Sequence, residues 1–533
     1  MSKRLKVIIA VILSAAAVCA VAAGVNAFTA RDSAFTFNTP MLIDVNTTVN
    51  GQIMNASDNE TYMFEVKDSG ALSILLEQEE LKDIVDDGWH ITVYKMEDDS
   101  AKTYSELANY KAYINTVTSS WSEVGIGPGT YLIVVEAGTL FIPGEFDLTV
   151  FFNKTENYER ETNDTKETAT PIAVNVARFG SSNERSNGVD TDWYVFEIKS
   201  DMTVEVEFNH AKETMPQSGW VVSVLTENGD VLADFSSDLN VTKLTSGILG
   251  LKAGRYYVCI DSQVLSDITY SLLVTARVHK DYEFEFNNTA ADANTLPIGK
   301  TMYGSLAPRI LAIDRDYWKF TVESDCVANL SFTHEDLIET TNGWNVRILR
   351  KTADGTEEFI KKVSAWNQTE LDINGIGLKA GTYYVCIDAD SLVMNNAEYG
   401  LTVTTSQNAA YETEPNNDTA SAKEMTLNKY CYGALISSNV NYDVDFYKFT
   451  LSEAKRVSVE FAHAANPEDS RTGWTISILD SAGKKVFAYD STCNRDYVSS
   501  EVLNLPAGTY YVKVENGLES VETPYSVRLV GAN

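Results

Sequence analysis

Apolar and polar residues alternate with a period of two along most of this chain. The segments Asp445–Leu451, Arg456–Phe461 and Thr509–Val514 show the pattern clearly, with β-branched and aromatic residues at many of their positions. Alternation of this kind places apolar side chains on one face of an extended strand. Turn residues separate the runs, and no long stretch has the period of an amphipathic helix. The pattern therefore predicts an all-β protein built from antiparallel β-sandwiches.

The same landmarks recur along the chain at a regular distance. A Gly-Trp pair enters a predicted strand four times, at Gly88, Gly219, Gly343 and Gly473. A Gly-x-Tyr strand follows each of them, at Gly129, Gly254, Gly381 and Gly508. The repeat of about 127 residues is too long for a solenoid unit and suits an independent domain. The 533 residues thus hold four repeats, which we call modules one to four.

The first 27 residues have the features of a secretory signal. Lys3, Arg4 and Lys6 precede a mostly apolar run from Val7 to Ala23, and Val25–Ala27 follows as the expected cleavage site. Cleavage would release a secreted protein. The run is also near the lower limit for spanning a bilayer, so an uncleaved segment would anchor the protein at the cell surface. We expect contact with a membrane only in that second case.

Acidic residues dominate the charge of the chain. Asp and Glu number 75 against 42 Lys and Arg, which gives a net charge of −33. Such a charge repels phosphate backbones and attracts cations, so nucleic acid is excluded as a partner. The charge agrees either with cation binding or with the solubility of a secreted protein.

Five cysteines follow the signal segment, and their odd number argues against a disulfide framework. Cys259 and Cys386 fall in matching strands, where a small buried thiol packs as a hydrophobe. A bridge between Cys431 and Cys493 inside module four is left open by the sequence.

A short acidic segment opens each of the last three modules. In module four it is Tyr411–Thr419, and near-copies begin at Tyr158 and Tyr282. Residues i, i+2 and i+4 of an extended segment face one side, so two glutamates and an asparagine present oxygen atoms together. Such oxygens suit a hard cation such as calcium, although the chain must curl for all three to reach one ion. The D-x-D pair of Asp443 and Asp445 could supply the missing oxygens.

Three features together resemble the bacterial pre-peptidase C-terminal (PPC) domain family: this acidic opening, a glycine before a D-x-D-aromatic strand, and a closing A-G-x-Y-Y strand. The family includes the collagen-binding domains of bacterial collagenases. The resemblance covers residues 158–530 and implies jelly-roll-like sandwiches. The predicted fold class is therefore a tandem array of four antiparallel jelly-roll-like β-sandwich domains after an N-terminal signal helix. Module one matches only in part, because it lacks the paired glutamates and has Ser57–Glu60 in place of D-x-D. The boundaries we expect are 1–27 for the signal and 36–153, 158–277, 282–405 and 411–530 for the modules.

The resemblance also implies one calcium ion in the linker of each of the last three modules. In module two the implied ligands are Glu159, Glu161, Asn163, Asp164 and Asp190. In module three they are Glu283, Glu285, Asn287, Asn288 and Asp314. In module four they are Glu412, Glu414, Asn416, Asn417 and Asp443. The alternative is a solvated linker without an ion.

Two further features repeat. One histidine stands before each of the last three Gly-Trp pairs, and we expect it to form a hydrogen bond at the strand end because one histidine is not a metal-binding set. The closing strands of the last three modules each carry two adjacent tyrosines, of which we expect one in the core and the other partly exposed. The histidines are His210, His334 and His463, and the tyrosine pairs begin at Tyr256, Tyr383 and Tyr510.

No catalytic motif is found: the chain lacks H-E-x-x-H, G-x-S-x-G and a P-loop. Ser481–Lys484 matches S-x-x-K but occupies a hairpin turn. We therefore predict a non-enzymatic monomer, secreted or at the cell surface, that adheres to a collagen-like extracellular protein or a polysaccharide. The rival interpretation is a structural spacer or an accessory module for a secreted peptidase system. An enzyme of unknown type would need a polar cluster confined to one module.

Overall fold

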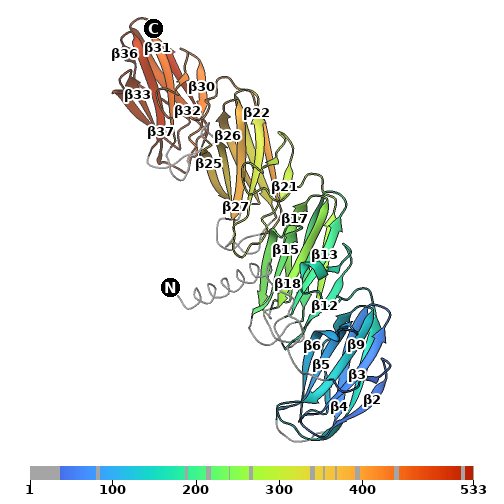
Figure 1. Cartoon of the computed structure of the whole chain (residues 1–533). Coiled ribbons are helices and arrows are strands. Elements are labelled where there is room, and N and C mark those ends of the chain that lie inside the picture. The colour runs from blue at the N-terminus through green and yellow to red at the C-terminus, as the bar shows by residue number, and fades with distance from the viewer. Residues whose placement is uncertain are drawn as a thin grey trace. The chain divides into compact units, whose positions relative to one another are not determined.

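A computed structural model of the chain describes residues 37–79, 85–186, 190–211, 218–238, 241–262, 268–335, 343–351, 355–365, 369–389, 396–436, 443–517 and 523–531. The expected signal segment, residues 1–27, lies outside these ranges. Strands dominate every described part of the chain, as Figure 1 shows. Within the same ranges, no helix is long and apolar enough to cross a membrane. The predicted all-β fold is confirmed.

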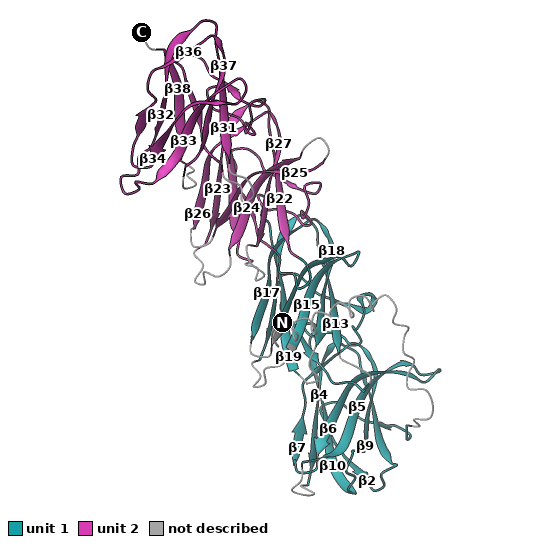
Figure 2. Ribbon diagram, turned by 90° about the vertical axis from the view of Figure 1, so that its left-hand side faces the viewer, with its two compact units in different colours: residues 1–280, 307–312 teal, residues 281–306, 313–533 magenta. Residues whose placement is uncertain are grey.

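The chain divides into two compact units, which Figure 2 distinguishes by colour. Unit one comprises residues 1–280 and 307–312, and unit two comprises residues 281–306 and 313–533. Modules one and two therefore fall in unit one. Modules three and four fall in unit two, apart from the short segment 307–312, which belongs to unit one.

Module one contains two sheets, with strand orders β1-β3-β9-β5-β6 and β2-β10-β4-β7, and β8 also pairs with β4. Its strands are β1 (Met41–Leu42), β2 (Thr48–Ile53), β3 (Asn59–Val66), β4 (Gly70–Gln78), β5 (Asp87–Asp98), β6 (Thr103–Tyr113), β7 (Thr118–Ser120), β8 (Val124–Ile126), β9 (Gly129–Ala137) and β10 (Gly144–Lys154).

Module two has the orders β11-β13-β18-β15-β16 and β12-β19-β14-β17. A short 3-10 helix, η1 (Lys166–Thr168), precedes the first strand. The strands are β11 (Thr170–Pro171), β12 (Arg178–Ser182), β13 (Thr191–Ile198), β14 (Met202–His210), β15 (Ser218–Thr226), β16 (Val231–Asp238), β17 (Lys243–Leu251), β18 (Gly254–Ser262) and β19 (Ile268–Arg277).

Module three repeats this plan with the orders β20-β22-β27-β24-β25 and β21-β28-β23-β26. Its strands are β20 (Asn294–Thr295), β21 (Met302–Gly304), β22 (Arg315–Val322), β23 (Cys326–His334), β24 (Trp344–Lys351), β25 (Glu357–Ala365), β26 (Glu370–Leu378), β27 (Gly381–Ala389) and β28 (Tyr399–Ser406).

Module four has the orders β29-β31-β37-β33-β34 and β30-β38-β32-β35, and β36 also pairs with β32. Its strands are β29 (Lys423–Glu424), β30 (Tyr430–Gly433), β31 (Val444–Leu451), β32 (Lys455–His463), β33 (Thr472–Asp480), β34 (Lys485–Thr492), β35 (Tyr497–Ser499), β36 (Leu503–Leu505), β37 (Gly508–Asn516) and β38 (Tyr525–Gly531).

The sheets are antiparallel except at one edge of each module, where a two-residue strand pairs in parallel with β3, β13, β22 or β31. The two sheets of a module share one core. In module four, Tyr447 and Phe449 of β31 contribute to the same apolar cluster as Val459 and Phe461 of β32. Burial of the alternating apolar face is the main stabilising contribution to each sandwich.

The tryptophan of each Gly-Trp pair lies at the centre of its core. Trp89, Trp220, Trp344 and Trp474 are at most 1% exposed. The predicted role of the repeated histidines is confirmed, because each ring nitrogen Nδ1 contacts the carbonyl oxygen of the next residue at 2.7–2.9 Å. Each of these imidazoles also packs against the tryptophan of its module, with ring centroids 3.9–4.5 Å apart. All five described cysteines are free, so Cys431 and Cys493 form no bridge here.

Candidate metal centre

The acidic linkers pair with their own modules through the backbone. The amide of the first glutamate donates to a carbonyl of the edge strand that follows it. These bonds join Glu159 to Phe179, Glu283 to Tyr303 and Glu412 to Tyr432, each at 2.9 Å. The acceptors belong to β12, β21 and β30, so this part of the linker extends one sheet of the sandwich.

Within each compact unit, the second glutamate pairs with the preceding module. The Glu161 amide donates to Gly125 O at 2.9 Å in unit one, and the Glu414 amide donates to Gly377 O at 2.8 Å in unit two. A Cβ at either glycine would lie less than 3.0 Å from linker backbone, so these positions require glycine for close approach. The peptide bond after the second glutamate is cis in all three linkers. Within each unit, one linker thus contacts two modules.

The carboxylate of the first glutamate is buried and hydrogen bonded through both oxygens. Its Oε1 accepts a backbone N–H from the residue that follows the glycine before the D-x-D strand. These residues are Ser181 at 2.8 Å, Ser305 at 2.7 Å and Ala434 at 2.7 Å. In modules two and four, Oε2 accepts a tyrosine hydroxyl, from Tyr194 at 3.0 Å and Tyr447 at 2.8 Å. The first glutamate is therefore fixed in place by the fold.

The second aspartate of the D-x-D pair lies beside these glutamates. Asp192, Asp316 and Asp445 are at most 1% exposed. One oxygen of each accepts a hydroxyl from the last long strand of its module: Tyr270 at 2.6 Å, Tyr399 at 2.7 Å, and Tyr525. The strand pattern places these aspartates on the inward face, and the tyrosines orient them.

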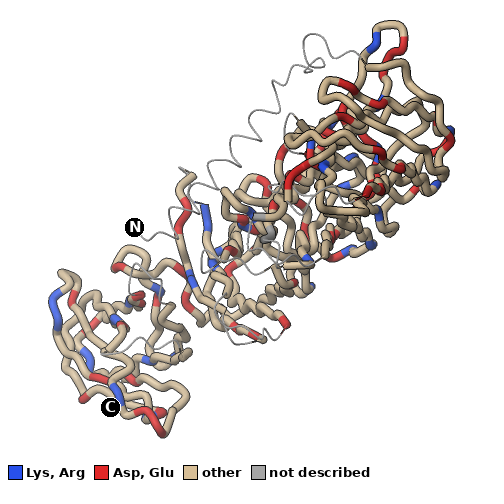
Figure 3. The backbone as a smooth tube through the Cα atoms, turned by 90° about the horizontal axis from the view of Figure 1, so that it is seen from below, with Lys and Arg blue, Asp and Glu red and all other residues tan. Residues whose placement is uncertain are grey.

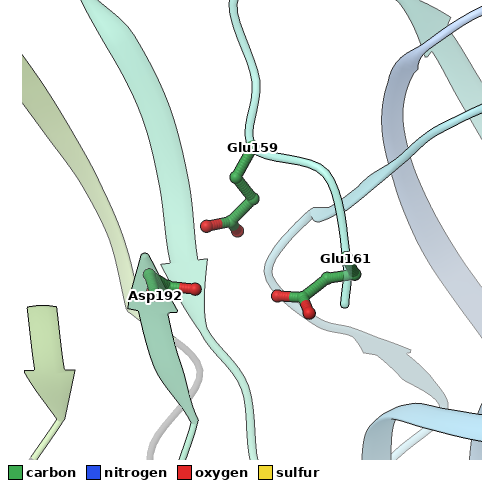
Figure 4. Close-up of side chains that lie close together, drawn as sticks. All are labelled: Glu159, Glu161 and Asp192. Carbon is green, nitrogen blue, oxygen red and sulfur yellow. The ribbon is translucent and has the colours of Figure 1, made fainter. Parts of the chain in front are cut away.

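Two glutamates and one aspartate converge in each of the three modules. A carboxylate oxygen from each lies within 4.8 Å of the others in the sets Glu159/Glu161/Asp192, Glu283/Glu285/Asp316 and Glu412/Glu414/Asp445. We call each set an inner cluster. In Figure 4, the glutamate side chains of module two extend from the linker toward Asp192, which lies near the start of β13.

Several buried oxygens at the inner clusters have no hydrogen-bond donor. In module four they are Glu414 Oε1, Asn416 Oδ1 and Asp445 Oδ1. In module two they are the matching atoms Glu161 Oε1, Asn163 Oδ1 and Asp192 Oδ1, and in module three they include Asn287 Oδ1 and Asp316 Oδ1. A buried oxygen without a donor is costly, and oxygens of the same residue types recur without a donor in all three modules. Carboxylate and amide oxygens together are ligands for a hard cation.

Burial and mutual repulsion raise the pKa of the clustered carboxyls. Burial, with the charges of Glu161 and Asp190, raises the pKa of Glu159 to about 8. Burial raises the pKa of Glu412 to about 7, and the nearby Asp443 contributes. The pKa of Asp445 is raised well above its ordinary value by burial and by Glu412. Without a cation the clusters favour protons, and a bound divalent cation would reverse that preference.

The predicted linker asparagines reach the inner clusters. Asn163, Asn287 and Asn416 are fully buried, at 0% exposed. The amide nitrogens of Asn287 and Asn416 donate to the first glutamate of their linkers at 2.9 and 2.8 Å. Their role as calcium ligands, like that of the paired glutamates, stays a prediction.

The first aspartate of D-x-D is placed differently from the second. Asp443 accepts backbone N–H groups from Ile436 at 2.5 Å and Val444 at 2.9 Å, and so holds the loop before β31. Asp190 accepts the Asn183 amide at 2.9 Å. Asp314 is buried, and its charge contributes to the raised pKa of Asp316. These three lie near the inner clusters but are not members of them.

The residues after the linker asparagines also lie outside the inner clusters. Asn288 Oδ1 accepts the Arg315 amide at 2.8 Å. The Asn417 amide lies 2.8 Å from Asp443 Oδ1 and 3.0 Å from Val444 O, and because both are acceptors we assign its nitrogen to this side. Asp164 contacts Arg185 at 2.6 Å. These contacts are to protein groups.

The resemblance assigns a ligand role only to the first aspartate of each D-x-D pair, and the sequence offers the second one, Asp445, only as a further source of oxygen in module four. Alternation could not separate the two aspartates, because positions i and i+2 share a face of a strand. The distinguishing contact is the tyrosine from the last strand, which is remote in sequence. A repeated Tyr at positions 270, 399 and 525 was the available signal.

Module one has no comparable cluster among its described residues. Glu60 takes the position of Asp192 and its pKa is raised by burial, but it is only partly buried. Phe146 stands where the other modules have the orienting tyrosine, and it leaves Tyr62 Oη without a hydrogen-bond partner. The interpretation of module one as a diverged module agrees with this arrangement.

The outer face of one sheet of module four carries exposed tyrosines. Tyr430, Tyr432 and Tyr497 are 44%, 38% and 51% exposed. Tyr432 and Tyr497 belong to one row of residues across β30, β38, β32 and β35, and Tyr430 lies two residues from Tyr432 on the same face. Arg528 packs over the Tyr430 ring at 4.4 Å. We call the surface formed by Tyr430, Tyr432 and Tyr497 the tyrosine face. The paired tyrosines of the closing strands are all buried or half-buried and form no exposed strip.

Acidic residues also occur along the rest of the described chain, where the tube in Figure 3 marks them in red. The inner clusters differ from this general acidity because eight of their nine acidic residues are buried and the ninth, Glu285, is half-buried. Surface charge alone does not account for them.

Residues 443–516 match the sequence model of a family described as the bacterial pre-peptidase C-terminal domain. The matched segment contains both D-x-D aspartates of module four, its Gly-Trp strand and its closing Tyr-Tyr strand, but neither linker glutamate.

Three solved structures are similar to parts of the chain. The pre-peptidase C-terminal domain of a collagenase from Bacillus anthracis is 19% identical, with 22% of this chain and 97% of that one covered and a TM-score of 0.18. PNGase F, a glycosylasparaginase from Flavobacterium meningosepticum, is 9% identical, with 44% and 100% covered and a TM-score of 0.19. The PBSX exported protein XepA is 13% identical, with 44% and 90% covered and a TM-score of 0.14. These scores are too low to carry an argument about function.

Proposed function

Because module four contains a bacterial pre-peptidase C-terminal domain, and because its acidic cluster recurs in modules two and three, we propose that the protein is a secreted or cell-surface, calcium-binding, non-catalytic adhesion protein. Its partner is an extracellular protein of collagen-like type or a polysaccharide. The observation that carries the proposal is the set of buried oxygens without donors at the inner clusters. A structural spacer or accessory module for a secreted peptidase system is the second candidate.

Calcium is the cation that suits the inner cluster best. It takes six to eight oxygen ligands at about 2.3–2.6 Å and accepts irregular geometry, which carboxylates and one amide oxygen can begin to supply. In module four the residues that would hold it are Glu412, Glu414, Asn416 and Asp445. No histidine or thiol is part of any cluster, which disfavours zinc.

Calcium would also bind the linker to both modules of a unit. In unit two, Glu414 pairs with Gly377 of module three through its backbone while its side chain belongs to the cluster of module four. Ordering this glutamate on an ion would therefore stabilise the junction as well as the sandwich. This is the use we assign to the metal, because no reaction at the site is implied.

A calcium titration tests this part of the proposal. We expect the full mature chain to bind three calcium ions in calorimetry at pH 8 and to melt at a higher temperature in calcium than in chelator. Each site would contribute about 2.7 kcal/mol at about one hundred times its Kd. In chelator, carboxyls whose folded pKa is raised to about 7 and about 8 stabilise the fold while protonated, and that stability is lost as the pH rises through those values. The melting temperature in chelator should therefore fall between pH 5 and pH 8, and the gain from calcium should increase.

Magnesium at equal concentration is the control, because it demands near-octahedral geometry and gives up its water reluctantly. An unchanged melt in calcium at pH 8, together with no heat of binding, would remove calcium from the proposal and leave a plain spacer.

The tyrosine face supports adhesion over a spacer. Tyrosine side chains offer large apolar area and a hydroxyl, which suits contact with a protein or a sugar. The presence of Arg528 beside Tyr430 adds a guanidinium to the same surface. The three tyrosines come from two separate strands, β30 and β35, and yet share one face.

We expect the full chain to be retained by fibrillar collagen or by an insoluble polysaccharide, and a variant with Tyr430→Ala, Tyr432→Ala and Tyr497→Ala to lose at least tenfold in affinity in a pull-down titration. The matched control is Tyr113→Ala, which removes a tyrosine that is 43% exposed in module one. Equal retention of both variants would place any ligand elsewhere. No retention of the wild-type chain on any matrix tested would favour the spacer.

A further inference from the structure

A second group of carboxylates in module two surrounds an arginine. Oxygens of Glu161, Asp164 and Asp190 lie within 4.8 Å of one another, and we call this set the outer cluster. The Arg185 guanidinium contacts all three: Nη2 lies 2.8 Å from Glu161 Oε2 and 2.5 Å from Asp190 Oδ1, and Nη1 lies 2.6 Å from Asp164 Oδ1. The side chain of Arg185 is 12% exposed, and those of Glu161 and Asp190 are 0% exposed. This is a largely buried cation with three anionic partners.

Glu161 belongs to both clusters and divides its oxygens between them. Its Oε2 pairs with Arg185, whereas its Oε1 is one of the buried oxygens without a donor at the inner cluster. The inner cluster of module two therefore keeps the same set of free oxygens as that of module four, on Glu161, Asn163 and Asp192. Arg185 has not taken the place of the ion expected there.

The other modules differ from module two at the residues that make the outer cluster. Asp164 corresponds to Asn288 in module three and to Asn417 in module four. In module four the Asn417 amide lies 2.8 Å from Asp443. This one neutral side chain takes the place that Asp164 and Arg185 together have in module two. The extra negative charge of module two thus occurs with an extra positive charge.

The residue at the position of Arg185 and its contacts also differ between modules. It stands five residues after the glycine that precedes the D-x-D strand, where module four has Ser438, a residue outside the described ranges. Module three has Arg309 at this position, but Arg309 belongs to unit one, where it donates to Leu232 O at 3.2 Å. Among the described residues, Arg185 is the one guanidinium that is paired with carboxylates of an inner or outer cluster.

We propose that Arg185 is a resident cation that occupies a second cation-binding position of module two, where its removal would create a site for a divalent metal. The outer cluster then keeps a positively charged partner without metal, while the inner cluster keeps its affinity for calcium. Arg185 also donates from Nε to Leu107 O of module one at 3.2 Å, so the same residue holds the linker to the preceding module. The assignment of calcium to the inner cluster rests on the proposed function, but the assignment of Arg185 does not.

The physical reason is the cost of burying like charges. Three carboxylates within 4.8 Å of one another repel strongly in a poorly solvated site, and one arginine fork compensates them through several charge-assisted hydrogen bonds. Removing the guanidinium leaves buried anions that must take up either protons or another cation. Oxygen ligands at this spacing favour a divalent metal when one is present.

The neighbouring backbone strengthens this contact with module one. Asn109 N donates to Glu184 O at 2.7 Å, and Ser186 N donates to Glu106 Oε1 at 2.6 Å. The segment 184–186 therefore lies along the edge strand β6 and carries Arg185 into the cluster from that side. This junction has protein partners for its outer carboxylates whether or not calcium is bound.

The test counts calcium ions bound to the full mature chain by calorimetry at pH 8. We expect Arg185→Gln to bind one ion more than the wild-type chain, because glutamine has no charge and the outer cluster would take a metal. The double variant Arg185→Gln with Asp164→Asn should return to the wild-type count, because it reproduces the asparagine of modules three and four. Arg185→Lys should also keep the wild-type count, because it retains the positive charge.

The change in the number of bound ions tests the role of Arg185, whereas the number bound by the wild-type chain tests the proposed function. Each can therefore fail without the other. If Arg185→Gln unfolds in chelator and is rescued by calcium, with the double variant folded in both conditions, the proposal is supported. An unchanged count in a folded Arg185→Gln variant would overturn it. A gain of one ion that persists in the double variant would overturn it as well.

Discussion

Replacing Asp445 by asparagine is expected to remove calcium from module four. Asp445 Oδ1 lies in the inner cluster without a donor, while its other oxygen accepts the Tyr525 hydroxyl. Asparagine keeps the size and one acceptor oxygen but removes a charge from the ion, which should weaken binding at least a hundredfold. Calorimetry of the full chain should then count two ions where the wild-type chain binds three. At about one hundred times the wild-type Kd the intact site contributes about 2.7 kcal/mol, and the variant should lose most of it.

Asp443→Asn is the matched control for this prediction. The two aspartates are two residues apart and both buried, but Asp443 bonds to backbone amides of Ile436 and Val444 and is not in the inner cluster. Its substitution should lower the melting temperature in calcium and in chelator alike and leave the count at three. The opposite result, with Asp443→Asn losing the ion and Asp445→Asn keeping it, would return the ligand role to the first aspartate.

The strands could be predicted from the sequence because alternation is a local signal. The predicted strand Asp445–Leu451 corresponds to β31, Val444–Leu451, and Arg456–Phe461 lies within β32. The Gly-Trp landmark was informative for a physical reason: it marks a side chain of large area at the core of every module. Period and landmark together fixed the order of strands along each repeat without any long-range contact.

The linker shows where local reasoning ends. An i, i+2, i+4 pattern identified two glutamates and an asparagine, and the structure brings all three near one cluster in module four. Their convergence depends on the pairing of Glu414 with Gly377 of the preceding module, which no property of the linker itself specifies. The same limit applies to Asp445, since its partner Tyr525 is 80 residues away in sequence.

Arg185 was missed for a different reason. The shared pattern of the repeats does not include this arginine, because its pairing with acidic residues of the linker is a feature of module two. The useful signal was a paired difference, an aspartate at position 164 where Asn288 and Asn417 stand in the later modules, together with a basic residue in the following loop. Differences between repeats carry site-specific information that the common pattern removes.

The glycine before the D-x-D strand has no room for a side chain in modules two to four. A Cβ at Gly433 would lie less than 3.0 Å from Tyr447 Oη and from Glu412 Oε1. Gly180 and Gly304 have the same neighbours in their modules, a tyrosine hydroxyl and the first glutamate. None of the three has a positive φ, so the constraint is the space taken by the glutamate and not the backbone conformation.

Gly433→Ala should therefore displace Glu412 and cost module four both its ion and part of its stability. Overpacking of this kind costs about 1–3 kcal/mol, and the loss should be visible in chelator as well as in calcium. The measurements are the melting temperature in both conditions and the ion count, which should fall from three to two. Gly531→Ala is the control, because a Cβ there meets only the Leu427 side chain at an ordinary 3.5 Å. If Gly433→Ala binds three ions with unchanged affinity, the packing of Glu412 on this glycine does not position the cluster.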